Sequence, residues 1–135
     1  MTTEHEHDND DSAVPPTLVF ESMAVWFDRW FSVTVARRLS GTAGRGRVFC
    51  PQWWRHDEVV GRLRDLWLAW EKAKASDDRG AGSAWWLHDA DPTLRVLLDA
   101  EAGPMYQCTR DNHVDTRPLQ ATLVAPPPGW FDGLD

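Results

Sequence analysis

Tryptophan content constrains the fold of this chain more than any other feature, with nine tryptophans beside one tyrosine and five phenylalanines. Each buried indole removes about 150–250 Å² of surface from water, so the chain has the material for a substantial hydrophobic core. The length of 135 residues is that of one ordinary domain. We therefore expect a small, tryptophan-rich single domain, which excludes a dinucleotide fold with a second domain and disorder throughout.

The ends of the chain differ in composition from its centre. Residues 1–17 are rich in Glu, His, Asp and Asn and are predicted to form a disordered acidic tail. Residues 18–125 are the predicted globular domain, and residues 126–135 form a Pro-rich aromatic strap. We favour a strap that folds back on the protein's own core through Trp130 and Phe131. In the alternative, these two side chains contact a groove of a partner protein.

Apolar residues recur every three or four positions in two segments, which predicts helices over 18–39 and about 56–75. A short third helix is expected over 83–89. The apolar run that follows predicts a β-hairpin over 94–108, with a helix over 92–101 as the alternative. The predicted fold class is therefore α+β, with two longer helices and a short helix packed on a hairpin. The predicted core indoles are Trp26, Trp30, Trp67, Trp70 and Trp85.

Two cysteines, Cys50 and Cys108, are each followed within six residues by a histidine, His56 and His113 respectively. Two thiolates and two imidazoles are a common tetrahedral ligand set for structural Zn²⁺. A shared ion would tie the start of the second helix to the hairpin, which suits a small domain. His88 is a rival fourth ligand. In the alternative interpretation, the cysteines are small buried hydrophobic residues and the histidines lie at the surface.

Charge is unevenly distributed along the chain, whose formal net charge is −7. Residues 37–64 hold seven arginines against two acidic residues, and such a block can bind phosphate or an acidic partner. A solvated patch paired with the protein's own acids is the other interpretation, and the overall negative charge opposes binding to a polyanion. The candidate residues for anion or nucleic-acid binding are Arg37, Arg38, Arg45, Arg47, Arg62 and Arg64.

Other function classes leave weaker signals. No segment approaches the ~20 consecutive apolar residues of a membrane span, and the acidic N-terminus is unlike a secretory signal, so we expect a cytoplasmic protein with reduced cysteines. A small hydrolase could use Cys108 with His113, or His88, as nucleophile and base. No third catalytic partner or oxyanion loop accompanies either pair, so a non-enzymatic role is favoured.

Five segments in a fixed order resemble a known family. They are Gly44–His56, which contains Cys-Pro-Gln-Trp-Trp-Arg-His, then Leu63–Glu71, Trp85–Pro92, Val96–Cys108 and Pro126–Phe131. Over about residues 20–131 the chain is similar to the actinobacterial domain-of-unknown-function family 4913. The resemblance implies a cytoplasmic protein of the kind carried on actinobacterial plasmids, integrative elements and phages, and it implies no activity.

The resemblance also bears on the candidate metal ligands. The family pattern contains Cys-Pro-x-Trp-Trp-x-His and a later Cys-x₄-His, which correspond here to the Cys50–His56 and Cys108–His113 pairs. This correspondence strengthens the zinc hypothesis. The chain departs from the pattern at Asp57, where a proline commonly follows the histidine, and over residues 80–83.

Taken together, these patterns predict a small interaction or scaffold module of an actinobacterial mobile element or phage, with structural zinc and a protein partner. The alternatives are a nucleic-acid-binding accessory protein that uses the arginine block, and a small hydrolase. The sequence leaves the oligomeric state open.

Overall fold

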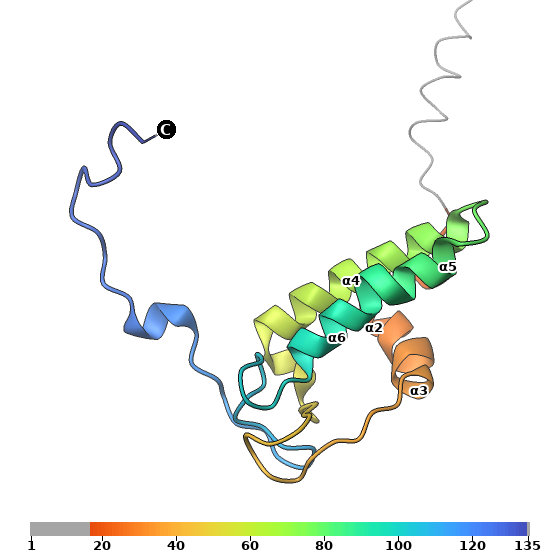
Figure 1. Ribbon diagram of the computed structural model, residues 1–135, viewed down its shortest axis with the longest axis horizontal. Helices are drawn as coiled ribbons and strands as arrows, with labels where there is room; N and C mark the ends of the chain where they lie inside the picture. Colours follow the sequence, from red (N-terminus) through yellow and green to blue (C-terminus); the bar gives the residue numbers. More distant parts are fainter. Residues whose placement is uncertain (1–16, 135) are drawn as a thin grey trace, which may run out of the picture. The chain divides into compact units, whose positions relative to one another are not determined.

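The computed structural model describes residues 17–134, and their contacts divide the chain into two compact units (Figure 1). Among the described residues, unit 1 comprises those up to Arg38 together with Val60–Arg95, and unit 2 comprises Leu39–Val59 together with residues 96–134. The predicted acidic tail lies outside the described residues except for Thr17. The predicted limits of the globular domain and the strap stay predictions.

Unit 1 begins with a short helical stretch made of α2 (Met23–Trp26), η1 (Phe27–Phe31) and α3 (Ser32–Thr34). The side chain of Ser22 caps it by accepting a hydrogen bond from the Val25 N–H at 3.2 Å. The stretch ends at Val35, whose backbone is extended, so the predicted helix over 18–39 is too long. Three consecutive β-branched residues disfavour helix there, and Val33 is 74% exposed, so no burial compensates.

Unit 1 also contains most of a long helix that the sequence predicted, followed by three shorter helical segments. Helix α4 spans Asp57–Ala75, which confirms the expected second helix, and its apolar stripe from Val59 to Trp70 is buried. After a loop come α5 (Ala81–Ala84), η3 (Trp85–Ala90) and α6 (Asp91–Leu97), which follow one another without a break and run alongside α4 in Figure 1. Among the described residues, none of these helices has the length and apolar character to cross a bilayer.

The predicted β-hairpin over 94–108, and with it the α+β fold class, is wrong. Residues 91–97 are helical, and the described part of the chain contains a single isolated antiparallel bridge, Arg47 to Asp99, in place of strands. The apolar run was misleading because its buried members, Leu94, Leu97 and Leu98, are spaced as one face of a helix. The fold is therefore helical with long irregular segments.

An indole cluster forms the core of unit 1, as the tryptophan content predicted. Ring centroids lie 6.0 Å apart for Trp26 and Trp30, 5.1 Å for Trp30 and Trp70, and 5.8 Å for Trp30 and Trp85. The Trp85 indole N–H donates to the Leu66 carbonyl at 3.1 Å. The buried N–H of Trp26 has no hydrogen-bond partner in the described part of the chain. Aromatic pairs at such separations add about 0.5–1.5 kcal/mol each beyond area burial.

Glu71 is a buried carboxylate in unit 1 that the sequence analysis did not single out. Its Oε1 accepts the Val19 N–H at 2.8 Å, and its Oε2 accepts the Phe20 N–H at 2.9 Å and the Trp67 indole N–H at 3.0 Å. Three donors therefore satisfy the carboxylate and fix the segment before α2 onto α4.

Unit 2 is held by hydrogen bonds between loops. The Val48 N–H donates to the Leu98 carbonyl at 2.9 Å, and the Ala100 N–H donates to the Gly46 carbonyl at 3.2 Å. Gly103 closes the turn after α6, where a Cβ atom would lie 2.5 Å from the Val96 carbonyl oxygen, so only glycine fits. Buried side chains of this unit include Val48, Cys50, Met105 and Cys108.

Replacing Glu71 by Gln tests its anchoring role. The amide nitrogen of Gln cannot accept a hydrogen bond, so at least one of the three buried donors loses its partner, and we expect a loss of about 1–3 kcal/mol in the free energy of unfolding. Urea denaturation of Glu71→Gln measures this loss. Asp65→Asn, which neutralises an exposed carboxylate on the same helix, is the control, and equal stability of the two variants would contradict the assignment.

Candidate metal centre

Two loops of unit 2 carry the four predicted metal ligands. Cys50 precedes the 3₁₀ turn η2 (Trp53–Arg55), and His56 lies between η2 and the first residue of α4. Cys108 follows the turn at Gly103, and its N–H donates to the Met105 carbonyl at 3.0 Å. His113 lies five residues further on. The short spacing within each pair therefore lets each loop present one sulfur and one imidazole.

The four side chains converge at one point. The Cys50 Sγ lies 3.2 Å from the His113 Nδ1, and the Cys108 Sγ lies 3.5 Å from the His56 Nε2 and 4.0 Å from the His113 Nδ1. All four ligand atoms lie within 4.8 Å of one another. Cys50, His56 and Cys108 are buried and His113 is partly buried. The predicted set is thus brought together by the fold.

The separations fit a tetrahedral ion. Zinc–sulfur bonds of about 2.3 Å and zinc–nitrogen bonds of about 2.0–2.1 Å place neighbouring ligand atoms roughly 3.3–3.8 Å apart around a tetrahedron. Of the three sulfur–nitrogen separations, 3.2 and 3.5 Å are close to that range, and 4.0 Å needs only a small adjustment. The donor set is also that of structural zinc, so the residues fit the ion.

Backbone N–H groups point at both sulfurs. The Gln52 N–H donates to the Cys50 Sγ, and the Val114 N–H donates to the Cys108 Sγ, each at 3.3 Å. Such donors favour the thiolate, which is the form that binds metal. The Cys108 Sγ also lies 3.2 Å from the Val114 carbonyl oxygen, a contact suited to a protonated thiol. Metal binding would replace that proton.

Each histidine is oriented by a second partner on its far side. The His113 Nε2 lies 2.6 Å from the Asp115 Oδ1, and the His56 Nδ1 lies 3.4 Å from the Thr116 Oγ1. A carboxylate only accepts hydrogen bonds, so its contact assigns the N–H of His113 to Nε2 and leaves the lone pair of Nδ1 facing the sulfurs. The Thr116 hydroxyl lies at the far nitrogen of His56, whose Nε2 faces the Cys108 sulfur. Metal-binding histidines almost always have such partners, which set the tautomer and the ring orientation.

Burial and neighbouring charges shift the proton affinities of the centre. Burial raises the pKa of the Cys50 thiol to about 11, and the neighbouring Cys108 acts in the same direction. Burial also lowers the pKa of His56, as does the nearby His113. The hydrogen bond with His113 lowers the pKa of Asp115, and Arg55 adds to this effect. The centre therefore favours a neutral His56 imidazole and an ionised Asp115.

The rival ligand and the arginines lie elsewhere. His88 is exposed on η3 in unit 1 and is not part of the cluster. The six arginines of the anion-binding hypothesis are divided between the units. Arg37, Arg38, Arg62 and Arg64 belong to unit 1, and Arg45 and Arg47 to unit 2, so the structure does not define one patch and the hypothesis stays a prediction.

Trp130 and Phe131 of the strap are 66% and 59% exposed. Folding back of these two rings onto the protein's own core, the favoured expectation, stays a prediction. Contact with a partner stays a prediction for both side chains.

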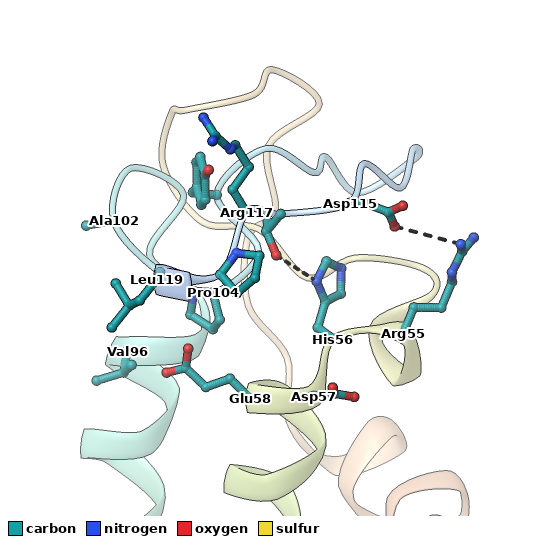
Figure 2. A pocket seen from close by; sticks show the side chains of 14 residues that line it. Arg55, His56, Asp57, Glu58, Val96, Ala102, Pro104, Asp115, Arg117 and Leu119 are labelled. Carbon is teal, nitrogen blue, oxygen red and sulfur yellow. Dashed lines mark hydrogen bonds and ion pairs between the residues drawn. The ribbon is translucent and has the colours of Figure 1, made fainter. Parts of the chain in front are cut away.

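A cavity of about 520 Å³ lies beside the centre in unit 2 (Figure 2). His56 forms part of its wall. Arg55 and Asp115 also line the cavity and form an ion pair, with the Arg55 Nη2 3.7 Å from the Asp115 Oδ1. Cys50, Cys108 and His113 do not line this cavity. The thiol–imidazole pair of the hydrolase hypothesis therefore does not face this cavity.

Sequence reasoning found the four ligands but missed the residues that support them. Asp115 and Thr116 orient the histidines, and Met105 is buried with its sulfur 3.4 Å from the Cys50 N–H. A signal for Asp115 was present, because a carboxylate is a common orienting partner of a metal-binding histidine and Asp115 lies two residues beyond His113. Thr116 and Met105 carry no comparable sequence signal.

Comparison with known proteins gives one match. The family model described as "Domain of unknown function (DUF4913)" matches residues 20–128. No curated protein and no solved structure matches the chain significantly.

Replacing Asp115 by Asn tests the orienting role of this carboxylate. The carboxylate that holds His113 is replaced by a neutral amide, so the hydrogen bond weakens and we expect the affinity for Zn²⁺ to fall by about 10–100-fold. Competition with a chromophoric chelator measures the affinity. Asp111→Asn is the control, because Asp111 is exposed in the same loop and pairs with Arg110. Equal affinities for the two variants would show that Asp115 does not support the centre.

The raised pKa of Cys50 predicts a pH-dependent metal affinity. With a pKa of about 11 this thiol is protonated at neutral pH, so Zn²⁺ must displace its proton and the affinity rises with pH. Calorimetric titrations at neutral pH in two buffers of different ionisation enthalpy count the released protons. We expect at least one proton per ion bound, and zero release would mean that the thiolate already exists in the metal-free protein.

Proposed function

This chain belongs to the DUF4913 family, and we propose that it is a non-enzymatic interaction module whose second unit is held together by a structural Zn²⁺ ion. The ligands are Cys50, His56, Cys108 and His113. The observation that carries the proposal is the convergence of these four ligand atoms within 4.8 Å in a buried position. A role in actinobacterial mobile elements or phages, as the resemblance implies, is part of the proposal.

The cost of burial supports the metal. Burying polar groups costs free energy, and the two thiols and two imidazoles face one another through sulfur–nitrogen contacts of 3.2, 3.5 and 4.0 Å. A metal ion repays this cost, because zinc binding contributes about 10–16 kcal/mol in small zinc-dependent peptides. Unit 2 needs such a contribution, since its described residues hold only the short turns η2 and η4 (Leu119–Thr122) and the ends of two helices.

A structural ion accounts for the centre better than a catalytic one. Catalytic zinc sites keep a position open for water or substrate, whereas four protein ligands close the coordination shell. Cys50 and Cys108 are 2% and 1% exposed, so a substrate has no path to either sulfur. No specific observation favours the hydrolase or the nucleic-acid alternative.

Exposed apolar side chains support the interaction role. In unit 2, Leu119, Leu123, Val124, Trp130 and Phe131 are each at least 59% exposed. Apolar side chains gathered along one segment mark contact surfaces more often than scattered ones do. A module that holds such a segment in place for a partner fits the absence of a catalytic set among the described residues.

Metal analysis of protein purified without a tag tests the proposal. We expect about one zinc per chain. Removal of the ion by a strong chelator should lower Tm by on the order of 10 °C, because saturation at a thousandfold over Kd is worth about 4 kcal/mol.

Variants separate the centre from adventitious binding. His56→Gln should lose the zinc, while His88→Gln, which replaces an exposed histidine outside the cluster, should keep it. Zinc far below one per chain, together with a Tm that chelation leaves unchanged, would refute the structural ion.

A further inference from the structure

An indole cleft lies in unit 1, apart from the residues of the metal centre. It has a volume of about 230 Å³. This is smaller than the ~300–1,000 Å³ of small-molecule sites, so it has room for about one aromatic side chain. Its walls and rim include Trp30, Trp70, Trp85, Trp86, Lys74 and Arg79.

The rim of this indole cleft is positively charged. Lys74 lies with its Nζ 5.3 Å from the centroid of the Trp70 ring, and Arg79 also lines the cleft. The one acidic lining residue, Asp78, already accepts the Gly80 N–H at 2.8 Å through its Oδ1. Trp86 is 36% exposed. The cleft therefore suits an aromatic group with a carboxylate next to it.

The C-terminal strap carries such a group in a preformed shape. Successive turns shape it, with the Trp130 N–H donating to Pro127, the Asp132 N–H to Gly129 and the Leu134 N–H to Phe131, each at 3.1 Å. Gly129 has φ +79°, which glycine tolerates. A preformed turn loses less conformational entropy on binding than a flexible chain does.

The strap and the indole cleft carry opposite charges. The chain has no Lys or Arg after Arg117, and the strap contains Asp132 and Asp135. The Trp130-Phe131-Asp132 sequence thus offers an aromatic ring followed by a carboxylate, which complements the indoles and the Lys74 and Arg79 charges of the cleft.

We infer that the strap of one copy of this chain binds in the indole cleft of a second copy, with Trp130 or Phe131 in the cleft and Asp132 at Lys74 and Arg79. This inference deepens the proposed function by naming the partner, and it rests on that function. Each copy has one strap and one cleft, so a reciprocal exchange closes a symmetric dimer. About 1,000 Å² would be buried in all, at the low end of specific interfaces, so the dimer depends on concentration.

Sedimentation velocity across a wide range of protein concentration tests the inference on the full, zinc-loaded chain. We expect a monomer–dimer equilibrium that Trp130→Ala weakens at least about thirtyfold, the effect of removing an interface hot spot. Trp54→Ala is the matched control, because Trp54 is another tryptophan of unit 2, 60% exposed, outside the strap. It should dimerise as the parent does.

Charge reversal locates the contact. Lys74→Glu and Asp132→Lys should each weaken the dimer, and the two substitutions combined should restore it. A monomer at every concentration would overturn the inference, whether the strap is then free or bound in its own cleft. Equal dimerisation of Trp130→Ala and Trp54→Ala would overturn it too, as would single charge reversals without effect.

Zinc content is measured on the same samples. A chain that stays monomeric but holds one zinc refutes the dimer and leaves the structural ion intact. A chain without zinc refutes the proposed function on its own.

Discussion

The convergence of two thiols and two imidazoles is the constraint on which unit 2 depends. Its backbone forms no sheet in the described residues, and its loops are joined by a few hydrogen bonds such as that between Val48 and Leu98. Four buried polar side chains would ordinarily weaken such a unit. Bound to one ion they would become its strongest link, because they join the loop before α4 to the loop after α6.

Unit 1 is stabilised mainly by the burial of its aromatic side chains. Its indoles bury a large area, and their polar atoms are mostly satisfied, as the Trp67 and Trp85 N–H groups show. Three donors surround the buried Glu71 carboxylate and offset the loss of its hydration. The Trp26 N–H, which lacks a partner among the described residues, is the exception and costs on the order of 1–3 kcal/mol. Burial of aromatic side chains therefore dominates the stability of unit 1.

Local periodicity predicted much of unit 1 and little of unit 2. Helix α4 was predicted because its apolar stripe and its terminal charges agree, and the indole cluster followed from the same stripes. The hairpin was wrong because an apolar run of five residues fits a strand as well as a buried helix face. The end of the first helix was missed because Val33 continues the apolar spacing but lies exposed.

The sequence predicted which residues could bind a metal but not where in the fold these residues meet. Residue type and spacing pointed to Cys50, His56, Cys108 and His113, since two cysteines and two histidines are a common ligand set of structural zinc. The shared ion was a hypothesis from ligand type alone, because the two pairs are more than fifty residues apart and the helical segments between them do not indicate where the two loops meet. His88 could be set aside only once the fold placed it on η3.

X-ray absorption at the zinc edge, on untagged protein as purified, tests the central claim most directly. The account predicts a first shell of two sulfurs at about 2.3 Å and two nitrogens at about 2.0–2.1 Å. A shell of oxygen and nitrogen without sulfur, or with one sulfur only, would contradict it, because Cys50 and Cys108 would then not share the ion.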